Sequence, residues 1–316
     1  MHPKISVIMS VYNGEAFLHE TIASILNQTF SDLEFIIIND GSTDNTSTIL
    51  ESYTDSRIRV FNQENIGLTK SLNNGLEKAK GEYIARQDTD DISDLQRLEY
   101  EVDFMKNHPD VGLVGTCGTV IDQKGKFLQS WKLPENHYNI NEMLLCGNSF
   151  IHGSVLFRRE CITTVGFYRE KFEYAQDYDL WLRIAEQYKV ANIDKELYKY
   201  RLNANAISRK KMKEQLYYHL LIMQLARERR TTGTDSLDEV DTKNIRSELT
   251  NKFQMSTRQI NQFKASSYIN KSYESLIDRD YFVAFKLFFK SILLDKRLAF
   301  KRIFKASLKL HKKFVL

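Results

Sequence analysis

The sequence is poor in cysteine, proline and glycine. Its three cysteines, Cys117, Cys146 and Cys161, are widely spaced and form no CxxC pair, which excludes a disulfide framework and gives no sign of a zinc site. We expect buried thiols in a reducing compartment. The chain has 3 prolines and 13 glycines in 316 residues, so it has no stretch typical of a flexible linker. Its length predicts about two domains.

Long hydrophobic runs are also missing. No apolar run approaches the roughly 18 residues that cross a bilayer. The N-terminal apolar stretch at 5–9 is too short for the core of a signal peptide and is followed by a turn signal at Asn13 and Gly14. We interpret this stretch as the first buried strand of a cytoplasmic protein. A GxGxxG motif is absent, because Gly112, Gly115 and Gly118 have the wrong spacing, and this excludes a nicotinamide dehydrogenase.

Charge is unevenly distributed along the chain. Residues 281–316 contain ten lysines and arginines and one acid, Asp295, which is a net charge of +9. The whole chain carries +4, so the preceding 280 residues carry −5. A mildly acidic body with a strongly basic tail indicates that the tail has a polyanionic neighbour.

Strand-like apolar runs alternate with helical patterns in the first half of the chain. Residues 35–38 are uninterrupted apolar residues, which suits a strand covered on both faces, and Leu68, Leu72 and Leu76 share one helical face. Repeated strand–helix–strand units predict an α/β fold with a mostly parallel central sheet flanked by helices. The expected strands are 5–10, 33–38, 58–61 and 82–87, and the expected helices are 15–28, 43–53 and 67–80.

The second half is mixed and then becomes helical. We expect strands at 111–122, 154–157 and 198–202, a return strand that ends at Trp131, and a helix at 177–188. From about Ser208 the pattern is helical, apart from a polar loop at 231–245. We therefore predict one domain over 1–207 and a C-terminal α-helical extension over 208–316 that ends in a basic amphipathic tail.

Three acidic clusters follow predicted strands or begin a predicted helix. Ligands of open parallel sheets bind at the carboxyl ends of the strands. The first cluster contains Asp40 and Asp44, and both residues are also typical of turns and helix N-caps. Asp40 directly follows an apolar strand, where its carboxylate can accept the imide N–H of uracil. We weigh a turn and a base contact equally for Asp40.

The second cluster is Asp88, Asp90 and Asp91. Three carboxylates in four residues repel one another unless a cation compensates them. A solvated acidic turn is one interpretation. The other is a Mg²⁺ or Mn²⁺ site, because hard cations prefer oxygen ligands, and so few protein ligands leave room for phosphates on the same ion.

The third cluster, Asp177 and Asp179, begins a helix. Acids at this position stabilise the helix dipole, and one of them is also placed to act as a general base. The two interpretations are compatible with each other.

Six motifs in this order give the sequence a specific resemblance to the inverting family 2 glycosyltransferases of the GT-A fold, over about residues 4–205. They lie at 6–15 (SVIMSVYNGE), 24–29 (SILNQT), 38–44 (INDGSTD), 65–73 (NIGLTKSLN), 81–91 (GEYIARQDTDD) and 175–181 (AQDYDLW). The resemblance makes 1–207 the catalytic domain and leaves the tail outside the match. It implies transfer of a sugar, a hexose or N-acetylhexosamine, from a UDP-sugar with inversion.

The resemblance also implies roles for individual residues. Asp177 matches the catalytic base, Asp90 the ligand of a Mn²⁺ or Mg²⁺ ion, and Asp88 a contact to the ribose or the metal. The remaining matches are nucleotide-sugar contacts at Ser10, Val11, Tyr12, Glu15, Asp40 and Lys70, and donor or acceptor contacts at His152 and Arg201.

The chain departs from the family pattern at two positions. Gln176 precedes the base where the family often has an acid, and Asn203 stands where many relatives have a histidine that reaches the metal or the diphosphate. We expect metal affinity or the closing of the site to differ accordingly.

The tail has more than one interpretation. Phe285, Phe289 and Ile292 fall on one helical face, and the pattern repeats from Phe300 to Leu308. Either this segment packs on the catalytic domain, or it rests on anionic lipid at the inner face of the cell membrane. The second option suits a glycan or lipid-linked glycan acceptor in bacterial surface polysaccharide synthesis. We expect no nucleic-acid partner, because no reader motif accompanies the charge.

Two other function classes remain as alternatives. A haloacid-dehalogenase-type phosphohydrolase also has an acid pair such as Asp88 and Asp90 after a strand, but Ile92 occupies a position where that family has threonine or valine. A non-catalytic protein that binds nucleotide sugars or acts as a scaffold on the same fold is the other alternative.

Overall fold

The computed structural model describes residues 2–203, 211–277 and 281–295. The described residues form two compact units. The first is drawn from Met1–Lys210 and Leu225–Asp235, and the second from Lys211–Gln224 and Ser236–Leu316. The division at 207/208 stays a prediction, and the return of 225–235 to the first unit is a feature that the sequence pattern did not indicate.

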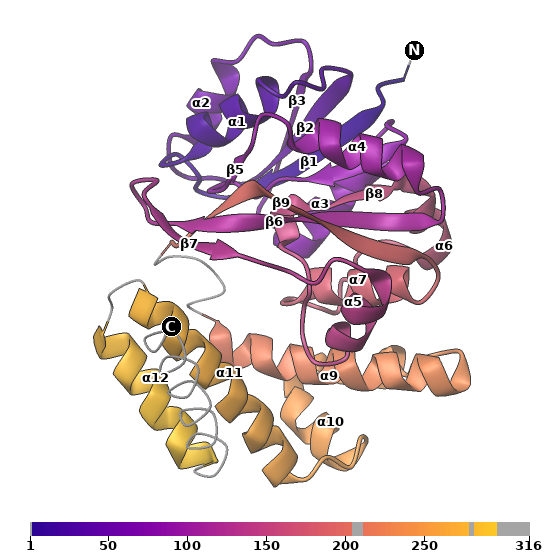
Figure 1. Cartoon of the computed structure of the whole chain (residues 1–316), viewed down its shortest axis with the longest axis vertical. Coiled ribbons are helices and arrows are strands. Elements are labelled where there is room, and N and C mark those ends of the chain that lie inside the picture. Colours follow the sequence, from indigo (N-terminus) through magenta and orange to yellow (C-terminus); the bar gives the residue numbers. More distant parts are fainter. Residues whose placement is uncertain (1, 204–210, 278–280, 296–316) are drawn as a thin grey trace, which may run out of the picture. The chain divides into compact units, whose positions relative to one another are not determined.

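A central sheet organises the first unit (Figure 1). Its strands lie in the order β3 (Ile58–Gln63), β2 (Leu33–Asp40), β1 (Ile5–Val11), β4 (Tyr83–Arg86), β8 (Leu156–Arg158), β6 (Val111–Ile121), β9 (Lys189–Arg201) and β5 (Ile92–Ser93), with β7 (Phe127–Trp131) beside β6. Of the nine strands in the described ranges, β5, β7 and β8 run against the other six. The predicted mostly parallel α/β sheet is confirmed.

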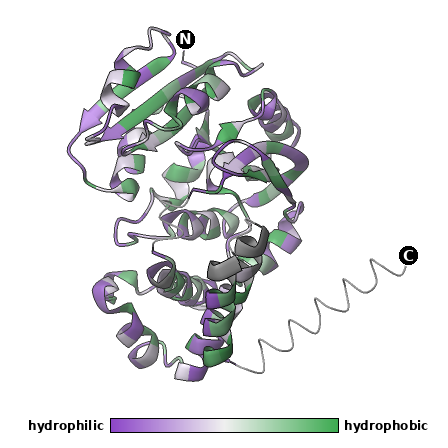
Figure 2. Ribbon diagram, turned by 90° about the vertical axis from the view of Figure 1, so that its left-hand side faces the viewer, coloured by the Kyte–Doolittle hydropathy of each residue, from purple (hydrophilic) through white to green (hydrophobic). Residues whose placement is uncertain are grey.

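Helices cover the sheet because alternate strand residues face opposite layers. Ile5, Val7 and Met9 belong to a buried cluster that includes residues of α1 (Leu18–Leu26) and α4 (Arg97–Asn107). On the other face, a Cβ at Gly75 of α3 (Leu68–Lys78) would lie 2.6 Å from Ile8 Cγ2, so glycine lets this helix approach the sheet closely. In Figure 2 the helices carry both colours along their length, as amphipathic helices do.

Four further helices belong to the sheet region: α2 (Thr46–Glu51), α5 (His137–Leu144), α6 (Arg159–Val165) and α7 (Gln176–Ala185). The second unit contains the start of α9 (Met212–Thr232), together with α10 (Ile245–Asn251), α11 (Thr257–Ile277) and α12 (Tyr281–Leu294). In the described part of the chain, no helix combines the length and the hydropathy that a membrane crossing requires.

Several predicted boundaries were wrong. The strand expected at 198–202 is only the end of β9, which begins at Lys189. The strand expected from residue 154 begins at Leu156, because His152–Ser154 form a short 3-10 helix. Helix α9 continues to Thr232, and the expected polar loop at 231–245 contains two short 3-10 turns, Leu237–Glu239 and Thr242–Asn244. The helix expected from 281 is present as α12, whereas tail residues 296–316 lie outside the described residues.

Candidate functional site

Three parallel strands end at one edge of the sheet and bring the first two acidic clusters together. Strand β1 ends at Val11, β2 at Asp40 and β4 at Arg86, and β1 pairs in parallel with both of the others. The predicted nucleoside residues Ser10, Val11 and Tyr12 therefore lie between Asp40 and the acidic loop 88–91. Thr89 Oγ1 donates to the Ser10 carbonyl at 2.9 Å, which ties that loop to the end of β1, and the Tyr12 side chain is exposed.

The loop after β1 is fastened to the loop after β2. The Gly14 N–H donates to Thr46 Oγ1 at 2.9 Å, and the Glu15 N–H donates to Asp44 at 3.1 Å. Glu15 in turn accepts two hydrogen bonds from Asn45, at 2.9 and 2.8 Å. Burial pushes the pKa of Asp44 up, but the hydrogen bonds from Thr46 and Glu15 outweigh it, so the pKa is lowered. The Glu15 carboxylate thus holds a loop, and its predicted nucleotide-sugar contact stays a prediction.

Asp40 is buried and shapes the neighbouring loop. Its carboxylate accepts hydrogen bonds from the Gln63 side chain at 2.8 Å, the Ile66 N–H at 2.9 Å and the Gly67 N–H at 3.0 Å. A carboxylate has about four lone-pair positions, so three bonds leave room for one further donor. The uracil contact remains a prediction for that position.

The acidic loop after β4 is held by hydrogen bonds to its backbone. Thr21 Oγ1 donates to the carbonyls of Thr89 and Asp91, at 2.7 and 2.9 Å. Gln87 Nε2 donates to the carbonyls of Asp88 and Asp91, both at 3.0 Å. These contacts fix the backbone of the loop and do not use the carboxylate oxygens of Asp88 and Asp90.

Two acids of this loop, Asp90 and Asp91, have raised pKa values. For Asp90, burial is the largest cause and the nearby Asp88 charge adds to it, while the Asn203 side chain, 3.2 Å from Asp90 Oδ2, opposes the rise. Asp91 is fully buried, and burial followed by the Asp90 and Asp88 charges raises its pKa well above the ordinary value. An electropositive partner at this loop would relieve that repulsion. Asn203, noted above as a departure from the family pattern, touches the predicted metal ligand.

Arg201 lies beneath the same loop. Its Nε donates to the Asp90 carbonyl at 2.8 Å, its backbone N–H donates to Asp91 Oδ1 at 2.8 Å, and its Nη2 pairs with Glu20. The side chain is only 2% exposed. This placement gives Arg201 a supporting role under the acidic loop, and its predicted contact with donor or acceptor stays a prediction.

His152 connects Arg86 to Asp88. Arg86 Nε donates to His152 Nε2 at 3.3 Å, so the histidine proton belongs on Nδ1, which lies 3.5 Å from Asp88 Oδ1. Arg86 also reaches Asp88 directly at 3.0 Å. Burial lowers the pKa of His152, Asp88 opposes that change and Arg86 reinforces it. A neutral His152 that orients Asp88 follows from these contacts, and its predicted substrate contact stays a prediction.

Asp177 lies in the first turn of α7. Asn148 Nδ2 donates to Asp177 Oδ2 at 2.7 Å, which leaves the other oxygen for a substrate proton. Ala175, two residues before Asp177, has a left-handed backbone with φ of 59°. This conformation is strained for alanine. The chain therefore turns sharply just before the predicted base.

Tyr168, which is buried, and His152, which is mostly buried, feel the charges of both the acidic loop and Asp177. Burial raises the pKa of Tyr168, Arg86 opposes the rise, and the charges of Asp177 and Asp88 both add to it. The same two carboxylates act on His152, whose ring lies 6.4 Å from that of Tyr168, centroid to centroid. Asp88 and Asp177, which are 89 residues apart in the sequence, therefore act on the same side chains.

Some residues near the candidate site were predicted from the sequence and others were not. Lys70 was predicted; it lies at the start of α3, is exposed, and has its Nζ 4.0 Å from Glu170. Asn148 and Tyr168 were missed, because an isolated polar residue in a loop and an isolated tyrosine give no pattern. Arg86 had a visible signal, since a charged residue within a buried strand needs a partner.

The donor set at the acidic loop fits a hard cation that shares its ligands with a substrate. Asp88 and Asp90 offer carboxylate oxygens, as Mg²⁺ and Mn²⁺ prefer. Within the described ranges, no group of three or more His, Cys, Asp and Glu side chains is placed to hold a metal ion. An ion at Asp90 would therefore take further ligands from the bound molecule.

We expect Glu101 on α4 to make the stability of the protein depend on pH. Glu101 is fully buried, and its nearest cation is the Arg97 Nε at 3.4 Å. Burial raises its pKa from 4.5 to about 8, with Arg97 opposing the rise. Between those values the unfolded chain is ionised and the folded chain binds a proton, so folding stability falls as pH rises, by at most about 1.4 kcal/mol per pH unit.

We expect Glu101→Gln to remove this dependence. From pH 5 to pH 8, the melting temperature of the wild type should fall relative to that of the variant. The reason is that only the wild type has a buried acid to ionise. Thermal unfolding at several pH values measures this difference. Parallel curves for the two proteins across that range would show that Glu101 has an ordinary pKa.

Comparison with known proteins gives a consistent result. The model of the family described as "Glycosyl transferase family 2" matches residues 6–166. The putative glycosyltransferase EpsE of Bacillus subtilis is 36% identical over 236 residues, which cover 71% of this chain and 82% of the relative. The O-antigen biosynthesis glycosyltransferase WbnJ of Escherichia coli is 39% identical over 186 residues, covering 58% of this chain and 72% of the relative.

Solved structures share the fold at low sequence identity. S. aureus TarS in complex with UDP-GlcNAc has a TM-score of 0.59 and 18% identity, and the match covers 84% of this chain and 80% of that one. The mannosyltransferase PcManGT from Pyrobaculum calidifontis, in complex with GDP-Man and Mn²⁺, has a TM-score of 0.56 and 15% identity, with coverage of 93% and 87%. These likenesses confirm the expected GT-A type of fold.

Proposed function

This chain belongs to glycosyl transferase family 2, and from that premise we propose that it transfers a sugar from a UDP-sugar to a hydroxyl group of a glycan or lipid-linked glycan, with inversion at the anomeric carbon. Membership of this family excludes the alternative of a haloacid-dehalogenase-type phosphohydrolase. The proposal rests chiefly on one observation: Asp88, whose carboxylate lies 3.5 Å from His152 Nδ1, and Asp177 both act electrostatically on His152 and Tyr168.

The chemistry assigns each acid one task. As the acceptor oxygen attacks the anomeric carbon, the bond from that carbon to the diphosphate oxygen breaks, and the hydroxyl proton moves to Asp177. The free oxygen of Asp177 takes the proton, while Asn148 holds the other oxygen at 2.7 Å. Attack from the face opposite the leaving group converts an α-linked donor to a β-glycoside.

The acidic loop accommodates the departing diphosphate. Asp90 would hold a Mn²⁺ or Mg²⁺ ion, with Asp88 toward the ribose or the same ion, and such an ion offsets the charge that builds on the leaving group. Arg201, Thr21 and Gln87 fix the backbone of the loop in advance. Preorganised groups of this kind need little rearrangement when the reaction occurs.

The similar proteins support the proposed donor and acceptor. UDP-GlcNAc in the TarS structure favours a uracil nucleotide and an N-acetylhexosamine or hexose, whereas GDP-Man in PcManGT keeps a guanine nucleotide as the competing outcome. The name of WbnJ supports a role in surface polysaccharide synthesis. Release of UDP or GDP from a panel of nucleotide sugars separates these outcomes, and no release from any donor would favour a non-catalytic binding protein.

We also propose that α12 rests on anionic lipid, which places the enzyme at the inner face of the cell membrane. Phe285, Phe289 and Leu293 are spaced by four residues and are 67%, 52% and 72% exposed, while Leu287 and Ser291 of the same helix are buried. Lys286 and Lys290 each follow one of the phenylalanines. An exposed apolar row beside lysines is typical of interfacial helices.

We expect the double change Phe285→Ser and Phe289→Ser to weaken binding of the full chain to phosphatidylglycerol vesicles at least about tenfold, because each buried phenylalanine contributes roughly 1.5–3 kcal/mol. Co-sedimentation measures the bound fraction. A matched control replaces Tyr138 and Met143, which are also exposed apolar residues but lie on α5. If both double variants sediment like the wild type, α12 is not a lipid-binding helix.

A further inference from the structure

The helix that carries Asp177 has a second acid with a different environment. Asp179 is fully buried and pairs with two arginines. Arg183 Nε donates to Asp179 Oδ2 at 2.9 Å from one turn further along α7, and Arg169 Nε donates to the same oxygen at 3.0 Å from the loop before the helix. Two cations against one buried carboxylate leave an excess positive charge, which requires another acid.

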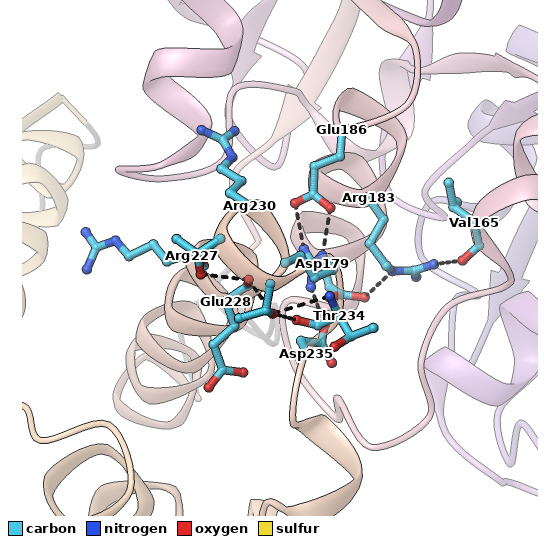
Figure 3. A network of polar contacts seen from close by, with 12 residues as sticks. Val165, Asp179, Arg183, Glu186, Arg227, Glu228, Arg230, Thr234 and Asp235 are labelled. Atoms are coloured by element: carbon cyan, nitrogen blue, oxygen red, sulfur yellow. Dashed lines mark hydrogen bonds and ion pairs between the residues drawn. The ribbon is translucent and has the colours of Figure 1, made fainter.

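That acid comes from 56 residues further along the chain than Asp179. Asp235 follows the end of α9, and it accepts two hydrogen bonds from Arg169 Nη1, at 2.9 and 2.7 Å. Arg229 of α9 pairs with Asp235 and also donates to both oxygens of Glu186 at the end of α7, at 2.7 and 2.9 Å. Figure 3 shows Asp235 and Asp179 within one network of polar contacts.

The contacts described form a continuous series of alternating charges. It runs from Glu186 through Arg229, Asp235, Arg169 and Asp179 to Arg183, so that three acids balance three arginines. The two ends of this series of charges are Arg183, within α7, and Glu186, which follows its last residue. Because every member is at least mostly buried, the loss of one member leaves a charge that water compensates poorly.

The same arginines fix the loop that leads to the base. Arg183 donates to the carbonyls of Val165 and Phe167, the latter at 2.7 Å, and Arg169 belongs to this loop itself. The loop then reaches Ala175, whose left-handed backbone is strained. Strained conformations persist only when the surrounding structure holds them firmly, and the charge network supplies that support.

We propose that Asp235 is a positioning residue for the catalytic base: through Arg169 and Asp179 it holds the loop 166–175 and the first turn of α7, and so the carboxylate of Asp177, in place. Residues 229–235 are then a working part of the catalytic unit. The inference rests on the proposed role of Asp177 as the base.

The test replaces Asp235 by asparagine, which keeps the shape and removes the charge. We expect amide hydrogen exchange in peptides covering 166–178 to accelerate about tenfold, since local opening becomes easier, while peptides of β1 and β2 stay unchanged. We expect kcat to fall about 10- to 100-fold, because small misplacements of reacting groups are costly, with the donor KM within about twofold. Asp235→Glu should recover most of both losses.

The control is Glu239→Gln, which removes a nearby acid from the exposed ion pair with Lys252, and it should change neither measurement. Unchanged exchange at 166–178 in Asp235→Asn, or a fall in kcat matched by Glu239→Gln, would overturn the inference. Because exchange is measured without substrate, an accelerated exchange in a protein that turns over no nucleotide sugar would instead indicate that the proposed function has failed.

Discussion

Replacing Asp177 by asparagine is expected to lower kcat by about 10²–10⁴-fold, the range that a positioned general base contributes. Asparagine preserves the size of the side chain and can still accept the hydrogen bond from Asn148, so the local structure should persist. The affinity for UDP should remain nearly unchanged, because the proposed task of Asp177 concerns only the acceptor hydroxyl. Initial rates of transfer and calorimetric titration with UDP measure the two quantities separately.

The control for this variant is Glu173→Gln. Glu173 lies four residues earlier, is exposed and bonds to Tyr174, so its loss removes one carboxylate from the same loop without touching the base. Its kcat should equal that of the wild type. Turnover near the wild-type level in Asp177→Asn would remove this residue from the role of base, and an equal loss of UDP affinity would indicate that it binds the donor instead.

Replacing Asp90 by alanine is expected to abolish the contribution of Mn²⁺ to UDP binding. In the wild type, UDP should bind more tightly with Mn²⁺ than without it. In the variant the two titrations should coincide, because the protein has lost the carboxylate that would hold the ion. The loss in the presence of Mn²⁺ should exceed the roughly 10–100-fold that removal of an outer-shell partner costs.

Asp103→Asn provides the matched control, since Asp103 is an exposed acid on α4 that pairs with Lys106 at 3.6 Å. This variant should keep the full effect of Mn²⁺. An unaltered Mn²⁺ effect in Asp90→Ala would place the ion elsewhere. A wild type that binds UDP equally well with and without Mn²⁺ would exclude metal assistance at the binding step.

The sheet and its acidic edge were predictable from sequence because they depend on local patterns. The uninterrupted apolar run before Asp40 indicated a strand buried on both faces, and β2 is buried along its whole length. The acids that follow such strands must then meet at one edge, because parallel strands end on the same side. For the same reason the sequence predicts that Asp88 and Asp90, which follow β4, lie at the same edge as Asp40.

Contacts between distant segments were not predictable in this way. Asp235 lay in a segment that we expected to be a polar loop, and nothing in its neighbours indicates that it pairs with Arg169, 66 residues earlier. Nor did the sequence indicate that the Arg201 guanidinium would donate to the backbone carbonyls of Asp90, Asp122 and Gln123. The first part of β9 was missed because Asp194, Lys195 and Glu196 interrupt its apolar pattern.

The most direct test of the central claim, that the acidic loop and Asp177 serve one nucleotide sugar, is nucleoside diphosphate release from a panel of UDP- and GDP-sugars with Mn²⁺ and an acceptor glycan. We predict metal-dependent release from at least one UDP-sugar, lost in both Asp90→Ala and Asp177→Asn. Release that survives in either variant, or that never occurs while the folded wild type also fails to bind any nucleotide sugar, would contradict the account.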